Sequence, residues 1–327
     1  MTMADRPSSP STAPDSLPPE PATPQKSLVY RIFTGPHGLR AGWRLLIFVA
    51  LFLAVTGLIR VVAIFVLHLP RPTAITPRLL MVGEILSFAC ALFAAWVMSR
   101  IERRPLGIYG LPGSGAFGRN FWAGSLWGAV TVSVLVFSIR AAHGLTFGGV
   151  ALPFHGALRY GVFWLVTFTF VGLFEEFTTR GYAQFTLASG IGFWPAAFLL
   201  SAFFGAVHLG NPGEGWIGAA SAAMIGLWLA FTLRRTGNLW FAVGFHAWFD
   251  YGQTFVYSVP NSGLVVHERL LNTTLAGPRW LTGGSVGPEA SLFNFILMGL
   301  LFVLFDRIYR NRPSVSTSSL GGRMVAL

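Results

Sequence analysis

Long apolar segments separated by short polar connections make up most of the chain. About 20 apolar residues in helical conformation suffice to cross the hydrocarbon core of a bilayer. The connections contain helix-breaking sequences such as LPRP, GLPGSG, SGIG, GNPGEG and RRTGN. The pattern predicts eight membrane helices, near residues 43–67, 79–98, 121–139, 158–187, 192–209, 215–233, 239–257 and 289–308.

The two ends of the chain are polar. Residues 1–27 are rich in Pro, Ser and Thr without an apolar run, which predicts a disordered tail and not a signal peptide. Residues 311–327 are expected to form a second, flexible tail. A transmembrane helical domain, 28–310, lies between the tails. Its longest connection, 258–288, is expected to lie against the membrane surface.

Composition places the chain in a membrane. Hydrophobic residues make up 53% and charged residues 11%, whereas about a quarter of the residues in soluble domains are charged. We therefore expect an all-α polytopic membrane protein, a helical bundle with an internal polar cavity. The single cysteine, Cys90, excludes an intramolecular disulfide and any multi-cysteine metal site.

The net charge of +11 does not indicate a nucleic-acid partner, because the basic residues are spread over short connections without a nucleic-acid motif. Their distribution predicts that both termini lie in the cytoplasm. Arginine almost replaces lysine, which occurs only at Lys26. That bias suggests a GC-rich bacterial genome and therefore a bacterial plasma membrane.

Ionisable side chains inside the apolar segments are the main chemical signal, because each costs at least ~2.5 kcal/mol at membrane depth. Arg60 and Glu84 lie in the first two predicted helices and have opposite charges, so we expect a structural ion pair between them. The other six residues of this kind lie between 175 and 250, on neighbouring predicted helices.

The first group is the stretch FEEFTTR, residues 174–180. Glu176 precedes Arg180 by four residues, and residues four apart share a helix face. Glu175 points elsewhere on the helix, 140° from Arg180. We therefore expect Glu176 and Arg180 to form a structural pair and Glu175 to be free for chemistry.

The second group is Phe204 and His208, four residues apart in FFGAVH. If the hairpin turn is near ASGIG, Glu175 and His208 lie at similar depth, because each residue rises ~1.5 Å along a helix. That depth requires the fourth helix to continue through Arg180. His246 and Asp250, in GFHAWFD, form a third group on one helix face.

These residues suit peptide hydrolysis, which needs an activated water and stabilisation of the oxyanion. Glu175 could deprotonate water held by His208. His246 could donate to the oxyanion, with Asp250 fixing its tautomer. Two imidazoles and one or two carboxylates also suit a divalent metal such as zinc, with Glu175, His208, His246 and Asp250 as candidate ligands. A metal-free mechanism is equally compatible.

Three motifs in this order resemble the CPBP intramembrane proteases, which include the type II CAAX prenyl endopeptidases and the bacteriocin-processing, Abi-type proteins. Residues 175–180 resemble the EExxxR motif. Residues 204–208 resemble FxxxH, and 246–250 resemble a histidine followed four residues later by Asn or Asp. The resemblance covers about residues 158–257.

The resemblance implies a helical membrane protease in which Glu175 and His208 activate water. It assigns His246 and Asp250 to the oxyanion side. Thr179 stands where many members have an aromatic residue, and Asp250 replaces the Asn of some members. An ionised Asp cannot donate a hydrogen bond, so orienting His246 or binding a metal fits Asp250 better.

Two other classes of function remain open at this point. Intramembrane carboxylates and histidines also build the proton relays of transporters. A non-catalytic scaffold could keep the same fold and present its tails to partners. For the protease, the expected partners are the lipid bilayer and a peptide or membrane-protein substrate. Prenylated substrates are not assumed.

Overall fold

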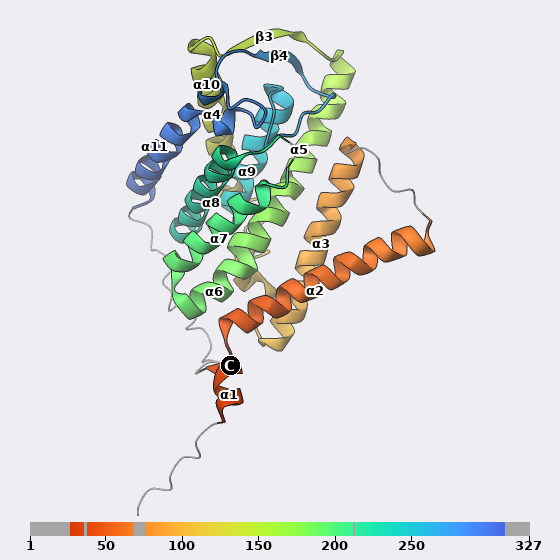
Figure 1. Cartoon of the computed structure of the whole chain (residues 1–327), viewed down its shortest axis with the longest axis vertical. Helices are drawn as coiled ribbons and strands as arrows, with labels where there is room; N and C mark the ends of the chain where they lie inside the picture. Colours follow the sequence, from red (N-terminus) through yellow and green to blue (C-terminus); the bar gives the residue numbers. More distant parts are fainter. Residues whose placement is uncertain (1–26, 36–37, 69–75, 212, 311–327) are drawn as a thin grey trace, which may run out of the picture. The chain divides into compact units, whose positions relative to one another are not determined.

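The structure is a computed structural model (Figure 1), and the chain divides into two compact units, residues 1–39 and 40–327. Apart from Ser27, the two predicted tails lie outside the described residues. The structure describes residues 27–35, 38–68, 76–211 and 213–310.

The first unit contains a short helix followed by a small antiparallel pair of strands. Helix α1 (Leu28–Phe33) begins after Ser27, whose hydroxyl accepts a hydrogen bond from the Tyr30 backbone N–H at 3.2 Å. Strands β1 (Thr34–Gly35) and β2 (Gly38–Leu39) pair with each other. None of the predicted site residues lies in this unit.

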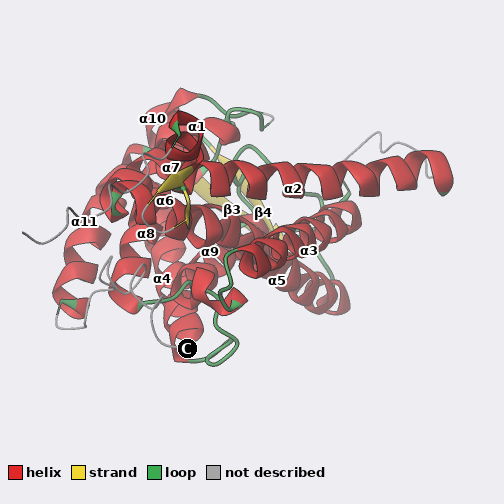
Figure 2. Cartoon of the chain, turned by 90° about the horizontal axis from the view of Figure 1, so that it is seen from below, coloured by secondary structure: helices red, strands yellow, loops and turns green. Residues whose placement is uncertain are grey.

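The second unit is predominantly helical, as the apolar pattern predicts. Its helices are α2 (Ala41–Val61), α3 (Pro77–Ile101), α4 (Arg119–Ala141), α5 (Phe154–Glu176), α6 (Gln184–Ile191), α7 (Phe193–His208), α8 (Trp216–Thr236), α9 (Trp240–Tyr251), α10 (Arg279–Thr282) and α11 (Leu292–Tyr309). Helix α2 extends beyond its neighbours in both views (Figures 1 and 2). Large apolar side chains on it are exposed, such as Leu53 and Leu58.

Each of the eight predicted segments is largely helical, but not all of them are long helices. Helix α7 has 16 residues and α9 has 12. The helix of the last predicted segment, α11, begins at Leu292 and not at residue 289, because a 3₁₀ turn precedes it. The prediction of eight spans is not confirmed by length. Six described helices are long and apolar enough to cross a membrane: Ala41–Val66, Pro77–Ile101, Arg119–Ala141, Phe154–Ile191, Trp216–Thr236 and Leu292–Tyr309.

The fourth predicted helix continues past the paired glutamates. A π-helical turn (Phe177–Ala183) follows α5 directly and leads into α6, and Gly181 within it has a non-helical backbone. Helix α6 ends before Gly192, whose φ of 86° favours glycine, and α7 then starts. Both the continuation through Arg180 and the hairpin turn near ASGIG are therefore confirmed.

Glycines allow α4 and α9 to pack closely. A Cβ added at Gly124 or Gly128 of α4 would collide with backbone of α9, and one at Gly244 of α9 would collide with backbone of α4. Small residues allow this close approach between membrane helices. The packing fixes the position of α9, the helix that carries His246 and Asp250.

An all-helical fold was expected, but the second unit also has a small antiparallel sheet at one end of the bundle (Figure 1). Strand β3 (Leu145–Val150) pairs with β4 (Leu271–Leu275), starting at Leu145 opposite Leu275. Strand β4 belongs to the predicted long connection, 258–288. Part of that connection folds back on the helices and reaches the cavity described next.

Candidate active site

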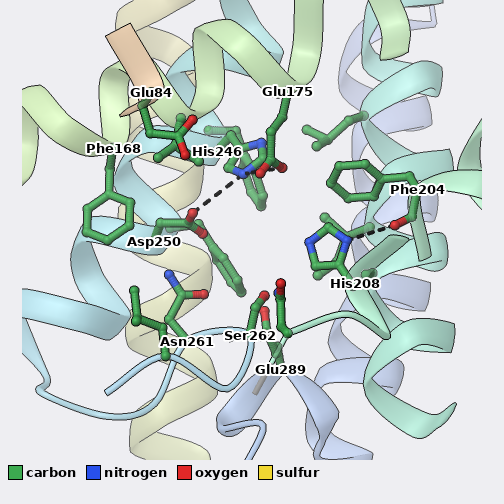
Figure 3. Close-up of a pocket in the computed structure, with 18 of the residues that line it drawn as sticks. Glu84, Phe168, Glu175, Phe204, His208, His246, Asp250, Asn261, Ser262 and Glu289 are labelled. Atoms are coloured by element: carbon green, nitrogen blue, oxygen red, sulfur yellow. Dashed lines mark hydrogen bonds and ion pairs between the residues drawn. The ribbon is translucent and has the colours of Figure 1, made fainter. Parts of the chain in front are cut away.

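A cavity of about 230 Å³ lies within the helical unit (Figure 3). Side chains from α3, α5, α7, α8 and α9, and from the connection between α9 and α11, line it. All four predicted catalytic residues face it: Glu175, His208, His246 and Asp250. The structure therefore brings these residues together, while their chemical roles stay predictions.

The buried side chain of Glu176 contacts residues of two motifs. Its Oε1 lies 3.0 Å from Nη1 of Arg180 and 2.8 Å from Nδ1 of His246. The ion pair with Arg180 is the one expected from their spacing. The contact with His246 was not predicted, because 70 residues separate the two in sequence. Glu176 therefore joins α5 to α9.

His246 presents its two ring nitrogens to different carboxylates. A carboxylate paired with arginine accepts hydrogen bonds, so Nδ1–H of His246 donates to Glu176. Its Nε2 lies 3.5 Å from Oδ2 of Asp250 and 3.6 Å from Oε2 of Glu175. Asp250 was expected to fix the tautomer of His246, but the residue at Nδ1 is Glu176. Asp250 is beside the other nitrogen.

The two adjacent glutamates have different surroundings. The side chain of Glu176 is 0% exposed and that of Glu175 is 26% exposed. Oε2 of Glu175 has no hydrogen-bond partner among the described residues. Consecutive helical residues point about 100° apart. Glu176 therefore reaches Arg180 and His246, while Glu175 faces the cavity. This is the asymmetry that the sequence predicts.

The ring of Phe204 lies between Arg180 and His208. Cζ of Arg180 is 4.0 Å from the centroid of this ring, a cation–π contact. The ring of His208 is 4.5 Å away, centroid to centroid. The guanidinium also packs on Gly226 of α8, where an added Cβ would collide with Nη2. Arg180 and Phe204 thus connect the first motif to the second.

The tautomer of His208 follows from its own helix. Nδ1 lies 2.7 Å from the backbone oxygen of Phe204. Because a carbonyl oxygen can only accept, Nδ1 carries the proton and Nε2 of the neutral ring is an acceptor. His208 therefore offers the cavity a nitrogen that can accept a hydrogen bond from water.

Thr179 is buried in the π-helical turn. Its hydroxyl donates to the backbone oxygen of Glu175 at 2.5 Å, and that of Thr178 donates to the backbone oxygen of Phe174 at 2.8 Å. The two hydroxyls satisfy carbonyls where the helix departs from regular α geometry.

Residues 157–252 match the family model described as type II CAAX prenyl endopeptidase Rce1-like. This segment belongs to the Rce1-like family. It contains all three motifs, so the resemblance to CPBP intramembrane proteases is confirmed. No curated protein and no solved structure matches the chain. With its apolar helices, the chain is an integral membrane protein, and residues 157–252 match an endopeptidase family.

Glu84, outside the Rce1-like segment, also lines the cavity. The predicted ion pair with Arg60 was wrong: Arg60 is exposed in the last turn of α2, and no ion pair joins the two in the described part of the chain. The C-terminal end of α2, which carries Arg60, extends away from the bundle (Figures 1 and 2), and hydropathy alone does not show this. Oε2 of Glu84 has no hydrogen-bond partner among the described side chains and backbone groups.

A second set of cavity residues outside the Rce1-like segment comes from the connection between α9 and α11. Asn261, Ser262 and Glu289 all line the cavity (Figure 3). Burial, and next the charge of Asp250, raises the pKa of Glu289 from 4.5 to about 8. The sequence analysis missed these residues because nothing in a polar connection specifies that it returns to the helices.

A metal ion such as zinc needs three or more ligands around one point. Within the described residues, no group of three or more His, Cys, Asp or Glu side chains is placed to hold a metal ion. Both nitrogens of His246 lie beside carboxylates, and Nδ1 of His208 is bonded to its own helix. The assignment of Glu175, His208, His246 and Asp250 as metal ligands stays a prediction, and no catalytic step is derived through a metal.

Proposed function

We propose that the protein is an intramembrane endopeptidase that hydrolyses peptide bonds of membrane-associated peptides or proteins. One observation carries this proposal. Glu175 and His208 face the same cavity, the first with a carboxylate oxygen that has no hydrogen-bond partner among the described residues and the second with an acceptor nitrogen. The membership of residues 157–252 in an endopeptidase family supports it.

In this proposal, Glu175 is the general base. It takes one proton from a water molecule, while Nε2 of His208 accepts a hydrogen bond from the other water hydrogen. The water oxygen then bonds to the carbonyl carbon of the substrate, and the π electron pair of the carbonyl moves to its oxygen. When the C–N bond breaks, Glu175 returns the proton to the leaving amine.

His246 has the role of stabilising the negative oxygen. In its protonated form, Nε2–H is a donor that faces the cavity, and Glu176 holds the opposite nitrogen at 2.8 Å. Asp250 lies 3.5 Å from Nε2. An ionised Asp250 is itself an acceptor only, so it acts through His246.

The test is cleavage by purified protein in liposomes, with membrane-anchored peptides supplied both unmodified and with a prenylated C-terminal CAAX sequence. The wild type and Glu268→Gln, a carboxylate change away from this cavity, are expected to cleave at least one substrate class. Glu175→Gln and His208→Ala are expected to be inactive. Undiminished cleavage by both Glu175→Gln and His208→Ala would overturn the proposal.

We also propose that both termini face the cytoplasm of a bacterial plasma membrane, which the distribution of arginine between the connections supports. A tag at Met1 should be digested by added protease in inverted membrane vesicles and protected in right-side-out vesicles. The opposite pattern would reverse the orientation.

A further inference from the structure

The predicted catalytic residues leave few hydrogen-bond donors for an oxyanion. Glu175 and Asp250 only accept when ionised. Nδ1–H of His208 is directed at a carbonyl of its own helix, and Nδ1–H of His246 is directed at Glu176. Nε2 of His246 remains, and two carboxylates lie beside it. The set therefore lacks a neutral donor that is free of competing acceptors.

The cavity has three neutral polar side chains among the described residues, Asn211, Asn261 and Ser262. The hydroxyl of Ser262 is hydrogen-bonded to Glu289. Asn211 is half-buried in the loop after α7, whereas Asn261 is only 6% exposed. Figure 3 shows the carboxamide of Asn261 pointing into the cavity, below Asp250 in this view. Asn261 is therefore the best-placed neutral donor.

Two neighbours hold the carboxamide of Asn261 in one orientation. Its Nδ2 donates to Oγ1 of Thr254 at 3.2 Å, and its Oδ1 accepts from Nε2 of Gln253 at 3.4 Å. Thr254 and Gln253 are both buried, so the two hydrogen bonds are shielded from solvent. A carboxamide has two N–H groups. Thr254 takes one, and the second is left for a group in the cavity.

The backbone beside Asn261 is held in an unfavourable conformation. Ser262 has a φ of 45°, in the left-handed region that non-glycine residues rarely adopt. Its backbone N–H donates to Oε1 of Glu289. The backbone oxygen of Glu289 accepts from Ser221 Oγ at 2.6 Å and Asn294 Nδ2 at 2.9 Å. Glu289 therefore anchors the turn to α8 and α11.

We propose that Asn261 is a further catalytic residue, whose free Nδ2–H donates a hydrogen bond to the oxyanion, and that Glu289 is a positioning residue that holds the Asn261–Ser262 turn over the cavity. The inference rests on the proposed peptidase function. Asn261 transfers no proton; it stabilises charge on the carbonyl oxygen while the water oxygen bonds to the carbon. Both residues lie outside the segment that matches the family model.

The first test compares Asn261→Asp with the wild type in liposomes. Asp has the same shape but no N–H, so kcat is expected to fall by about 10²–10³, with KM changed only a few-fold. Asn272→Asp makes the same chemical change at an exposed position of β4, in the same connection, and its kcat should stay near that of the wild type.

A transition-state analogue separates donation from a structural effect. A peptide phosphinate places a negative oxygen where the oxyanion forms. Its inhibition constant is expected to rise with Asn261→Asp in parallel with the loss of kcat/KM, while substrate KM stays similar. Thermal unfolding of each variant in detergent checks that the fold is retained.

Glu289 is tested by two substitutions. Glu289→Ala removes the acceptor for Ser262 N–H, and kcat should fall about 10-fold or more, because small misplacements of catalytic groups are costly. Glu289→Gln keeps an acceptor oxygen and should lose less activity. This rescue by Gln is expected for a positioning residue and not for a proton donor.

The outcomes separate the two proposals. If Glu175→Gln abolishes cleavage while Asn261→Asp keeps kcat within a few-fold of the wild type, the role of Asn261 is wrong and the peptidase stands. If kcat falls with Asn211→Asp and not with Asn261→Asp, the oxyanion donor is Asn211 and the role of Asn261 is wrong. If no cleavage depends on Glu175, the proposed function and this inference both fall.

Discussion

Oε1 of Glu176 lies 2.8 Å from Nδ1 of His246, and this contact joins helices α5 and α9 inside the bundle. The same oxygen is 3.0 Å from Nη1 of Arg180, whose guanidinium lies over the ring of Phe204. Phe204 in turn packs against His208. The three sequence motifs are therefore parts of one connected network, and each link can be tested separately.

Glu176→Gln should destabilise the folded protein, because Glu176 forms a buried ion pair with Arg180. The substitution leaves the buried guanidinium of Arg180 without its counter-charge, and breaking a buried ion pair from one side costs about 3–5 kcal/mol. The free energy of unfolding, measured by denaturant titration in detergent, is expected to fall by this order.

Glu175→Gln is the matched control, since it changes the adjacent carboxylate in the same way. Its free energy of unfolding should stay within about 1 kcal/mol of the wild type, because Glu175 has no buried partner of opposite fixed charge. Equal destabilisation by the two variants would contradict the separation of their roles.

Phe204→Leu should lower kcat without a large change in KM. The ring lies between Arg180 and His208, so its loss lets the imidazole shift, and displacements near 1 Å can cost about 10²-fold in rate. The comparison is Phe198→Leu on the same helix, where the side chain is exposed. Similar kinetics for the two variants would show that Phe204 does not position His208.

The stability of the protein should depend on pH through Glu289. Its pKa is raised from 4.5 to about 8 in the folded protein, first by burial. The folded state therefore binds this proton more tightly than the unfolded chain does. The resulting stability is fully present below pH 4.5 and is lost as the pH rises through about 8.

Thermal unfolding between about pH 5 and pH 9 checks this dependence. The Tm of the wild type should decrease more over this range than the Tm of Glu289→Gln, which cannot ionise. Asp250 and Glu214 contribute nearby charge to both proteins and are unchanged in the comparison. If Tm changes with pH equally in the wild type and in Glu289→Gln, folding does not shift the pKa of Glu289.

Metal chelators should leave the cleavage rate unchanged. Within the residues that the structure describes, no group of three or more His, Cys, Asp or Glu side chains is placed to hold a metal ion. Dialysis against a strong zinc chelator, followed by the peptide assay, is expected to retain activity within about two-fold, and added zinc should not raise it. Loss of activity that zinc restores would contradict the metal-free mechanism.

Local patterns in the sequence were enough to predict much of the fold and of the site. Apolar length located the helices, and the four-residue spacings placed Glu176 with Arg180 and Phe204 with His208. Hairpin geometry brought Glu175 and His208 to one cavity. These features depend on helix periodicity, which is local.

Contacts between distant segments could not be predicted in the same way. The approach of Glu176 to His246 depends on α5 packing closely against α9, where a Cβ added at Gly172 would lie 3.1 Å from the backbone oxygen of Val243. Glu84 was paired with Arg60 because both lie in early helices, yet it faces the cavity. A polar connection carries no periodic signal, so the position of Asn261 was also missed.

The most direct test of the central claim is the single-turnover cleavage rate of Glu175→Gln relative to the wild type, in the same liposomes and with the same peptide. Gln keeps the shape of the side chain but cannot take a proton from water. The mechanism predicts a rate at least about 10²–10⁴-fold lower. A rate within a few-fold of the wild type would show that Glu175 does not activate the water.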